Sequence, residues 1–214
     1  MITARTLAVG LAALGVATFA WAQQEAPPED DVLQRYLLAT ERLEEAAEAL
    51  PGDAAAAQQA LDRAFSALLT LARGSSGTLA ESLDRVFERA RTAVENRSAT
   101  DLAVQTTVLR GGFQRLLYES ALTAAVQGQP ELARSRLLRL SRDVGLGAAR
   151  LDQLDQLDRA GPLRRVFEAG VAERVAARLS SLQEAGGPAD TDAAYRELSR
   201  AYADYLLVQD SGRI

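Results

Sequence analysis

Four glutamates in one short segment are the residues whose type and spacing come closest to a binding chemistry. They are Glu41, Glu44, Glu45 and Glu48 in the sequence ERLEEAAE, which contains Glu-x-x-Glu twice. Residues three or four apart share one face of a helix, so these carboxylates could jointly hold a hard cation such as iron. The alternative is a solvated face of a surface helix, which is the ordinary setting of such charges. The sequence leaves both open.

Four arginines form a second group, at Arg134, Arg136, Arg139 and Arg142. A guanidinium group can bind a carboxylate or a phosphate through two parallel hydrogen bonds. This basic helix could therefore bind an acidic protein partner or an anionic lipid. The alternative is that the four arginines pair with acidic residues of neighbouring helices inside the fold.

Three tyrosines near the C-terminus, Tyr195, Tyr202 and Tyr205, form a third group. A phenolate oxygen can bind ferric iron, and the three positions share one helical face. Aromatic residues at this spacing are more often part of a core, because each ring buries a large apolar surface. We therefore predict that these tyrosines lie in the core, with Leu198 and Leu206 on the same face.

The residue types that the chain lacks exclude several kinds of catalysis. There is no histidine and no cysteine, and every basic residue is arginine. Without these side chains the chain has no zinc site of the usual kind, no Cys or Ser–His nucleophile and no Schiff-base lysine. We therefore predict that the protein is not an enzyme and has no resident cofactor. An enzyme that uses carboxylates alone, as many glycosidases do, is the remaining catalytic alternative.

Residues 1–22 have the organisation of a secretory signal peptide. Arg5 provides a positive charge, Leu7–Phe19 is an uncharged apolar run, and the segment ends in Ala-Trp-Ala, which fits a cleavage site. A polar leader with two prolines follows at residues 23–30. We predict an exported chain, periplasmic or extracellular; an uncleaved leader that anchors the chain in a membrane is the alternative. Export and a net charge of −5 argue against binding to nucleic acid.

Helices must position all of these groups, because apolar residues recur at steps of three and four through residues 31–210 and no segment alternates as a strand would. The pattern predicts one all-α domain of about eight helices, arranged as a bundle or as an array of antiparallel hairpins. We expect helices at residues 31–50, 53–73, 78–96, 98–126, 130–144, 148–160, 163–184 and 192–209. Residues 211–214 form a tail.

The centre of the chain, Val104–Leu140, is typical of two antiparallel helices with a four-residue connection. Gly128 is placed to end the first helix in a left-handed cap, and Pro130 is placed to open the second. Gly111 and Gly112 lie inside the first helix, where each glycine costs about 1 kcal/mol relative to alanine. We interpret this pair as a place where a neighbouring helix approaches closely, with a kink or a ligand contact as alternatives.

Two segments resemble a known family. They are FQRLLYESALTAAVQGQPELARSRLLRLSRDVGL, at Phe113–Leu146, and YRELSRAYADYLLVQDSGR, at Tyr195–Arg213. In helix texture and in the LLVQDS ending they resemble the helical extracytoplasmic region that precedes the membrane permease in some bacterial high-affinity iron permeases. The iron-handling signature of that family, Arg-Glu-x-x-Glu on membrane helices, is absent from this sequence. The resemblance implies a role beside an iron-uptake system rather than transport by this chain itself, and it leaves iron binding open.

Two hypotheses for the function follow. The first is an exported, non-enzymatic helical module accessory to an envelope transport system, with iron uptake as the system that the resemblance implies. It would act by protein contact or by weak metal binding through oxygen ligands. The second is an envelope scaffold or adaptor that binds a partner through the arginine-rich central hairpin. Both hypotheses require an envelope protein as the partner.

Overall fold

The structure is a computed structural model that describes residues 30–71, 77–157, 159–184 and 191–209. The elements within these ranges are helices: α1 (Asp31–Ala49), α2 (Ala54–Leu71), α3 (Gly77–Glu95), α4 (Ala99–Val126), α5 (Pro130–Asp143), α6 (Ala148–Asp155), α7 (Ala160–Glu184) and α8 (Thr191–Leu206). The predicted all-α fold of about eight helices is thereby confirmed. The predicted signal peptide at 1–22, the leader up to residue 29 and the tail at 211–214 lie outside the described residues.

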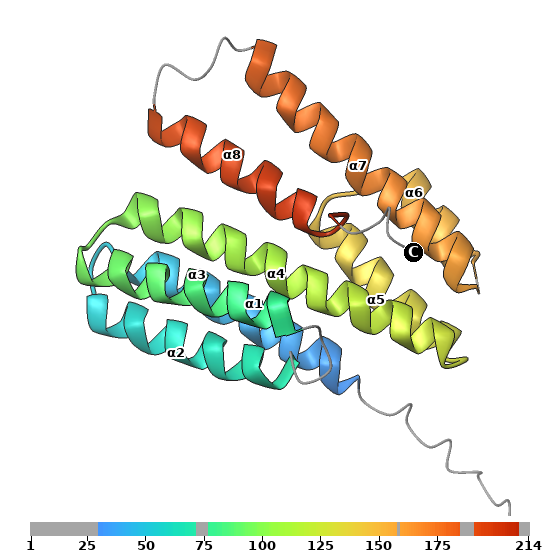
Figure 1. The fold of residues 1–214 in the computed structure, drawn as a ribbon, viewed down its shortest axis with the longest axis horizontal. Helices are drawn as coiled ribbons and strands as arrows, with labels where there is room; N and C mark the ends of the chain where they lie inside the picture. The colour runs from blue at the N-terminus through green and yellow to red at the C-terminus, as the bar shows by residue number, and fades with distance from the viewer. Residues whose placement is uncertain (1–29, 72–76, 158, 185–190, 210–214) are drawn as a thin grey trace, which may run out of the picture.

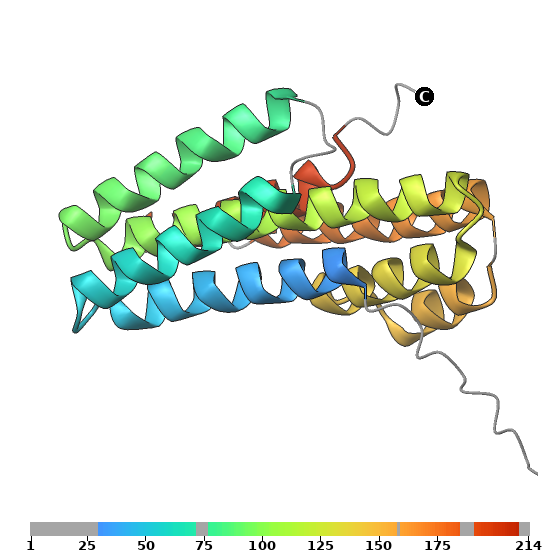
Figure 2. The same cartoon turned by 90° about the horizontal axis from the view of Figure 1, so that it is seen from below.

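The other helices pack around α4. It contacts α1, α2, α3, α5, α7 and α8, and Figure 1 shows α1–α3 on one side of it and the α7–α8 pair on the other. Seen from below, α5 lies along the C-terminal half of α4, and α6 packs against α5 and α7 (Figure 2). Buried residues occur on every side of α4, from Leu102 to Ala124. A helix that is covered all round has no need of a polar face.

The connection between α4 and α5 follows the predicted signals. Gly128 has a φ of 75°, the left-handed conformation that glycine adopts most easily. Pro130 occupies the first turn of α5, where its missing N–H leaves no hydrogen bond unmade. The prediction was wrong at Pro162. This residue was expected to lie between two helices, but α7 already begins at Ala160. A proline is tolerated there because it lies in the first turn.

The glycine pair inside α4 allows two helices to approach on adjacent faces. A Cβ on Gly111 would lie 2.8 Å from the Cα of Ala203, in α8. A Cβ on Gly112 would lie 2.1 Å from the nearest methyl carbon of Leu83, in α3. Close helix approach is therefore the reason for both glycines, as predicted, and it fixes where α8 can sit.

Large apolar side chains fill the core between α4 and its neighbours. The rings of Phe65 and Phe87 lie 5.1 Å apart, and those of Phe87 and Phe113 lie 6.2 Å apart, which joins α2, α3 and α4. Tyr118 of α4 stacks on Phe167 of α7 at 5.0 Å. Among the described helices, none is both long enough and apolar enough to cross a membrane.

Candidate functional site

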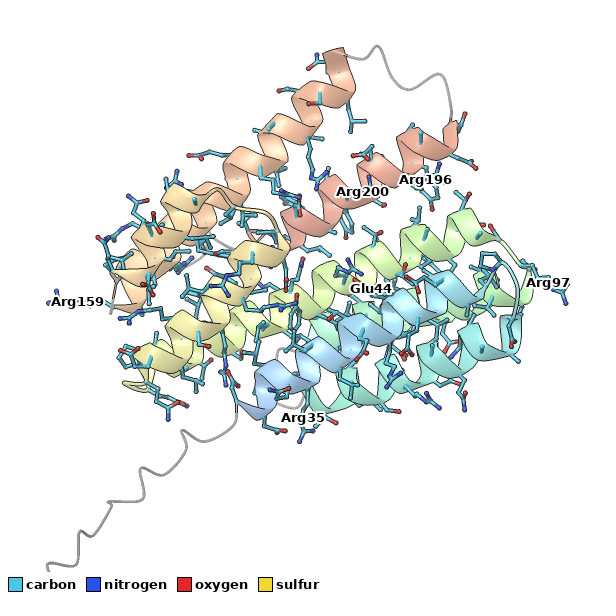
Figure 3. All side chains as sticks on the ribbon, turned by 180° about the vertical axis from the view of Figure 1, so that it is seen from behind. Arg35, Glu44, Arg97, Arg159, Arg196 and Arg200 are labelled. Atoms are coloured by element: carbon cyan, nitrogen blue, oxygen red, sulfur yellow. The ribbon has the colours of Figure 1, made fainter. Side chains whose placement is uncertain are left out.

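The four glutamates of α1 are not gathered into a group of three or more carboxylates, and no such group of potential metal ligands occurs in the described part of the chain. Glu45 pairs with Arg42 at 2.5 Å, and Glu44 pairs with Arg110 of α4 at 2.7 Å. Glu41 and Glu48 are exposed. Figure 3 labels Glu44, which joins α1 to α4 through its arginine. This arrangement fits the solvated-face alternative rather than a preformed metal site.

Arg136 is a structural residue inside the fold. Its Nε and Nη2 donate to the two carboxylate oxygens of Asp30 at 2.8 and 2.7 Å, and its Nη1 donates to the carbonyl of Ser120 at 3.0 Å. Asp30 also caps α1 by accepting a hydrogen bond from the backbone N–H of Leu33. The side chain of Arg136 therefore holds α5 against α1 and α4, and each of its three nitrogens donates a hydrogen bond within the molecule.

The other three arginines of the predicted partner surface differ from one another. Arg134 donates to the carbonyl of Leu157 at 3.1 Å, and Arg139 pairs with Asp143 at 3.0 Å. Arg142 is exposed and makes no ion pair with the residues that the structure describes. The basic surface left for a partner is therefore smaller than the sequence pattern indicated. Partner binding through these arginines stays a prediction.

A hydrogen-bonded chain that includes Arg139 connects α5 to α1. The hydroxyl of Tyr36 donates to Asp143 at 2.7 Å, and the same carboxylate oxygen accepts from Arg139 at 3.0 Å. Burial of the ring, and then the adjacent carboxylate, raise the pKa of Tyr36 far above its ordinary value. The hydroxyl therefore keeps its proton at neutral pH, and its role is to position the two helices.

A second chain of the same kind, with a glutamate in place of the aspartate, connects α7 to α4. The hydroxyl of Tyr118 donates to Glu168 at 2.5 Å, and Glu168 accepts from Arg164 at 2.9 Å. In both chains the acid follows the arginine by four residues, so both lie on one helix face. Burial raises the pKa of Tyr118 as it does that of Tyr36, with a further increase from the carboxylate. Neither tyrosine could be recognised as a link between helices from local sequence patterns, because their partners lie far away along the chain.

The second half of α7, from Ala172, and the whole of α8 form a pair that we call the α7–α8 hairpin. A buried carboxylate holds it together: Asp204 accepts from Arg174 at 3.0 Å and from Arg178 at 2.7 Å. The other buried residues of α8 are small, namely Ser199, Ala201 and Ala203. The inner surface of the hairpin is therefore made of short side chains and one ion-pair network.

Five large apolar side chains of the hairpin are exposed. In α8, Tyr195 is 43% exposed, Leu198 55%, Tyr202 49% and Tyr205 45%, and in α7 Leu179 is 47% exposed. We call the four α8 residues the α8 stripe. The prediction that these tyrosines lie in the core is wrong.

Close packing against α4 explains the reversal. Ala203 lies so near Gly111 that even a methyl group on Gly111 would collide with its backbone. A tyrosine ring cannot occupy such an interface, so the small-residue face of α8 turns inward and the aromatic face turns outward. The signal was present in the sequence as small residues at 199 and 203, four apart, together with a glycine on the partner helix. Aromatic periodicity alone pointed to the wrong face.

A groove of about 470 Å³ lies between α1, α2, α4 and α5. Leu71, Leu116 and Leu132 contribute to its apolar lining. Its two charged lining residues are engaged elsewhere, Glu119 with Arg115 at 2.8 Å and Arg136 with Asp30. The groove is therefore lined by apolar side chains and neutral polar groups. Both of its charged side chains are already paired within the protein, so it offers weak recognition of a charged ligand.

The exposed side of the α7–α8 hairpin is the candidate site that these observations single out. Isolated exposed apolar residues are common on protein surfaces, but a set of large ones along one helix marks a contact surface. Comparison of the chain with protein families, with curated proteins and with solved structures finds no match.

Proposed function

We propose that this protein is an exported, non-enzymatic helical scaffold that acts by protein contact through the exposed side of the α7–α8 hairpin. The observation that carries the proposal is the direction of the side chains. The hairpin buries small residues and the carboxylate of Asp204, and it exposes the α8 stripe and Leu179. Leaving tyrosine and leucine in water forgoes burial free energy of about 1.5–3 kcal/mol for each fully buried large side chain. A binding partner would recover part of it.

The state of the buried polar groups supports a scaffold rather than a catalyst. Tyr36, Tyr118 and Asp204 each have a partner within the fold, at 2.5–3.0 Å. Groups engaged in this way fix the positions of helices. All three groups are already hydrogen-bonded within the fold, whereas a general acid or base must be able to exchange a proton with a substrate.

The setting that we propose is an envelope transport system. Support for it comes from the sequence resemblance to the extracytoplasmic region of bacterial iron permeases. Protein contact is the mode of action that the hairpin favours over metal binding, because arginines already occupy Glu44 and Glu45 on α1. Titration calorimetry with ferric and ferrous iron tests the metal-binding alternative directly.

Site-specific photo-cross-linking in the producing cell tests the contact role. A photoreactive residue replaces Leu198 in one variant and Leu69 in the other. The two leucines are matched, at 55% and 54% exposed, but Leu69 lies on α2. We expect covalent adducts heavier than the chain at position 198 and few or none at position 69. Equal adduct patterns at the two positions would overturn the proposal.

A further inference from the structure

The face of α8 that carries the stripe is uncharged. On the helical wheel, the residues directly beside the stripe are Ala194, Ser199, Ala201 and Leu206. All the charged residues of α8 lie on the remaining faces; Figure 3, seen from behind, labels two of them, Arg196 and Arg200. In a chain of which 25% is charged, a neutral face along a whole helix is a distinct surface.

An occupant of this face must itself be neutral where the two surfaces meet. A charge buried against the stripe would lose its hydration and find no opposite charge there, at a considerable cost in free energy. The exposed sides of α1, α3 and α5 are not neutral, because arginines and acidic residues are distributed over them. The same face of a second copy of the chain meets it.

The spacing of the four positions in the stripe is the same in both directions, although the residue types are not. Tyr195, Leu198, Tyr202 and Tyr205 are separated by three, four and three residues. We infer that the α8 stripe is a two-fold interface at which two copies of this protein pair through antiparallel α8 helices. Two-fold interfaces use the same patch on both subunits, so such a patch must be complementary to itself.

Antiparallel pairing also places a smaller side chain against a larger one in two of the three pairs that face each other. Leu198 meets Tyr202 of the partner subunit, and Tyr195 meets Tyr205 of the partner subunit. On the flanks, Ala194 lies across from the larger Leu206 of the partner subunit. A parallel pair would instead place the two copies of each residue together, small against small and large against large, and it would align the two helix dipoles unfavourably.

The area available predicts a weak, reversible dimer. An aromatic side chain has about 150–250 Å² to bury, so a half-exposed tyrosine offers on the order of 100 Å². The stripe then offers on the order of 400 Å² per subunit, against about 800 Å² in a standard interface. This inference rests on the proposed contact role of the hairpin and adds the identity of the partner.

Analytical ultracentrifugation of the purified chain tests the dimer. The average mass should rise from that of one chain toward that of two over about a hundredfold increase in concentration. Leu198→Glu should weaken this association at least about tenfold, since it buries a charge at the centre of the stripe. The matched control, Leu69→Glu, should associate like the wild type. A wild-type chain that stays monomeric over the whole range would overturn the inference.

Disulfide formation tests the orientation, and the absence of cysteine from the sequence makes the experiment clean. Leu198→Cys and Tyr202→Cys variants are mixed and oxidised, and the linked peptides are identified by mass spectrometry. Antiparallel pairing brings the two different positions within the roughly 7 Å between Cα atoms that a disulfide allows, so mixed disulfides should dominate. Predominance of 198–198 and 202–202 links would contradict it.

The outcomes separate this inference from the proposed function. If the wild type is monomeric but photo-cross-linking at position 198 still captures another protein, the hairpin is a contact surface for a different partner and the dimer is excluded. If the wild type instead binds phosphatidylglycerol vesicles, and Leu198→Glu does not, the surface serves a membrane. If position 198 behaves like position 69 in every assay, both the dimer and the contact role fail.

Discussion

The α1–α3 region and the α7–α8 hairpin pack against the same helix, α4, by different means. The first region buries large apolar side chains, among them Phe65 and Phe87, in a continuous core. The hairpin buries alanines, a serine and Asp204, and its tyrosines face outward. Because stabilisation scales with the apolar area removed from water, the first region should supply most of the stability. The hairpin should then be a surface for contact, whose exposed residues contribute little to folding.

Truncation of a core aromatic residue should show the largest difference between the two regions. Phe87 is fully buried and contacts two other rings, so Phe87→Ala should lower the free energy of unfolding by about 3–5 kcal/mol. Tyr202→Ala removes a ring of similar size from the hairpin and should change it by at most about 0.5 kcal/mol. Urea denaturation at low protein concentration measures both. Similar losses in the two variants would remove the distinction between the regions.

Removal of the hairpin's buried carboxylate should have the next largest effect. Asp204→Ala leaves the guanidinium groups of Arg174 and Arg178 without their shared partner. These groups are 29% and 24% exposed, so water can replace part of the loss, and we expect a cost of about 2 kcal/mol. Hydrogen exchange should become faster in the hairpin and remain unchanged in α1–α3. Uniformly faster exchange throughout the chain would show that the hairpin is not a separate unit of stability.

The two adjacent glycines of α4 face different regions: Gly111 faces the hairpin and Gly112 faces α3. Substitution of each by alanine therefore compares how tightly the two regions pack against α4. Gly111→Ala would force a methyl group against the backbone of Ala203, so α8 must shift, at a cost of about 1–3 kcal/mol. Gly112→Ala would meet the end of the Leu83 side chain, which can change rotamer. A higher helix propensity, worth about 1 kcal/mol, offsets part of that cost. Thermal melting should therefore show Gly111→Ala to be the less stable variant.

Alkaline pH should act through the tyrosine that links α4 to α7. The pKa of Tyr118 is raised in the folded state, chiefly by burial. The resulting stabilisation is fully present below about pH 10, the pKa of tyrosine in an unfolded chain, and is lost as the pH rises above it. Above pH 10 the wild type should lose up to about 1.4 kcal/mol per pH unit more than Tyr118→Phe. Parallel pH profiles for the two proteins would contradict this assignment.

Local sequence signals predicted most of the fold. Helical periodicity located the helices, Gly128 and Pro130 marked the turn between α4 and α5, and Asp53 was expected to begin a helix. The carboxylate of Asp53 indeed accepts from the backbone N–H of Ala56 at 2.9 Å. These features depend on residues within one or two helical turns, so the sequence alone contains the information they need.

Pairings between distant residues could not be predicted in the same way. Arg136 binds Asp30, which is 106 residues away and was assigned to the leader. Four arginines on one helix therefore pointed to a partner surface, although one of them is buried inside the molecule. The stripe of α8 shows a related limit: periodicity identifies which residues share a face, but the direction of that face depends on the helix that it meets.

The central claim is that the α8 stripe is a contact surface and contributes nothing to the core. The thermal melting midpoint of the double variant Leu198→Glu/Tyr202→Glu, measured in dilute protein, tests it most directly. We predict a midpoint within about 2 °C of the wild type, because two half-exposed side chains are replaced without disturbing the inner face of α8. A fall of roughly 10 °C, as expected for the Phe87→Ala core variant, would show that the stripe is buried in the folded protein and would contradict the account.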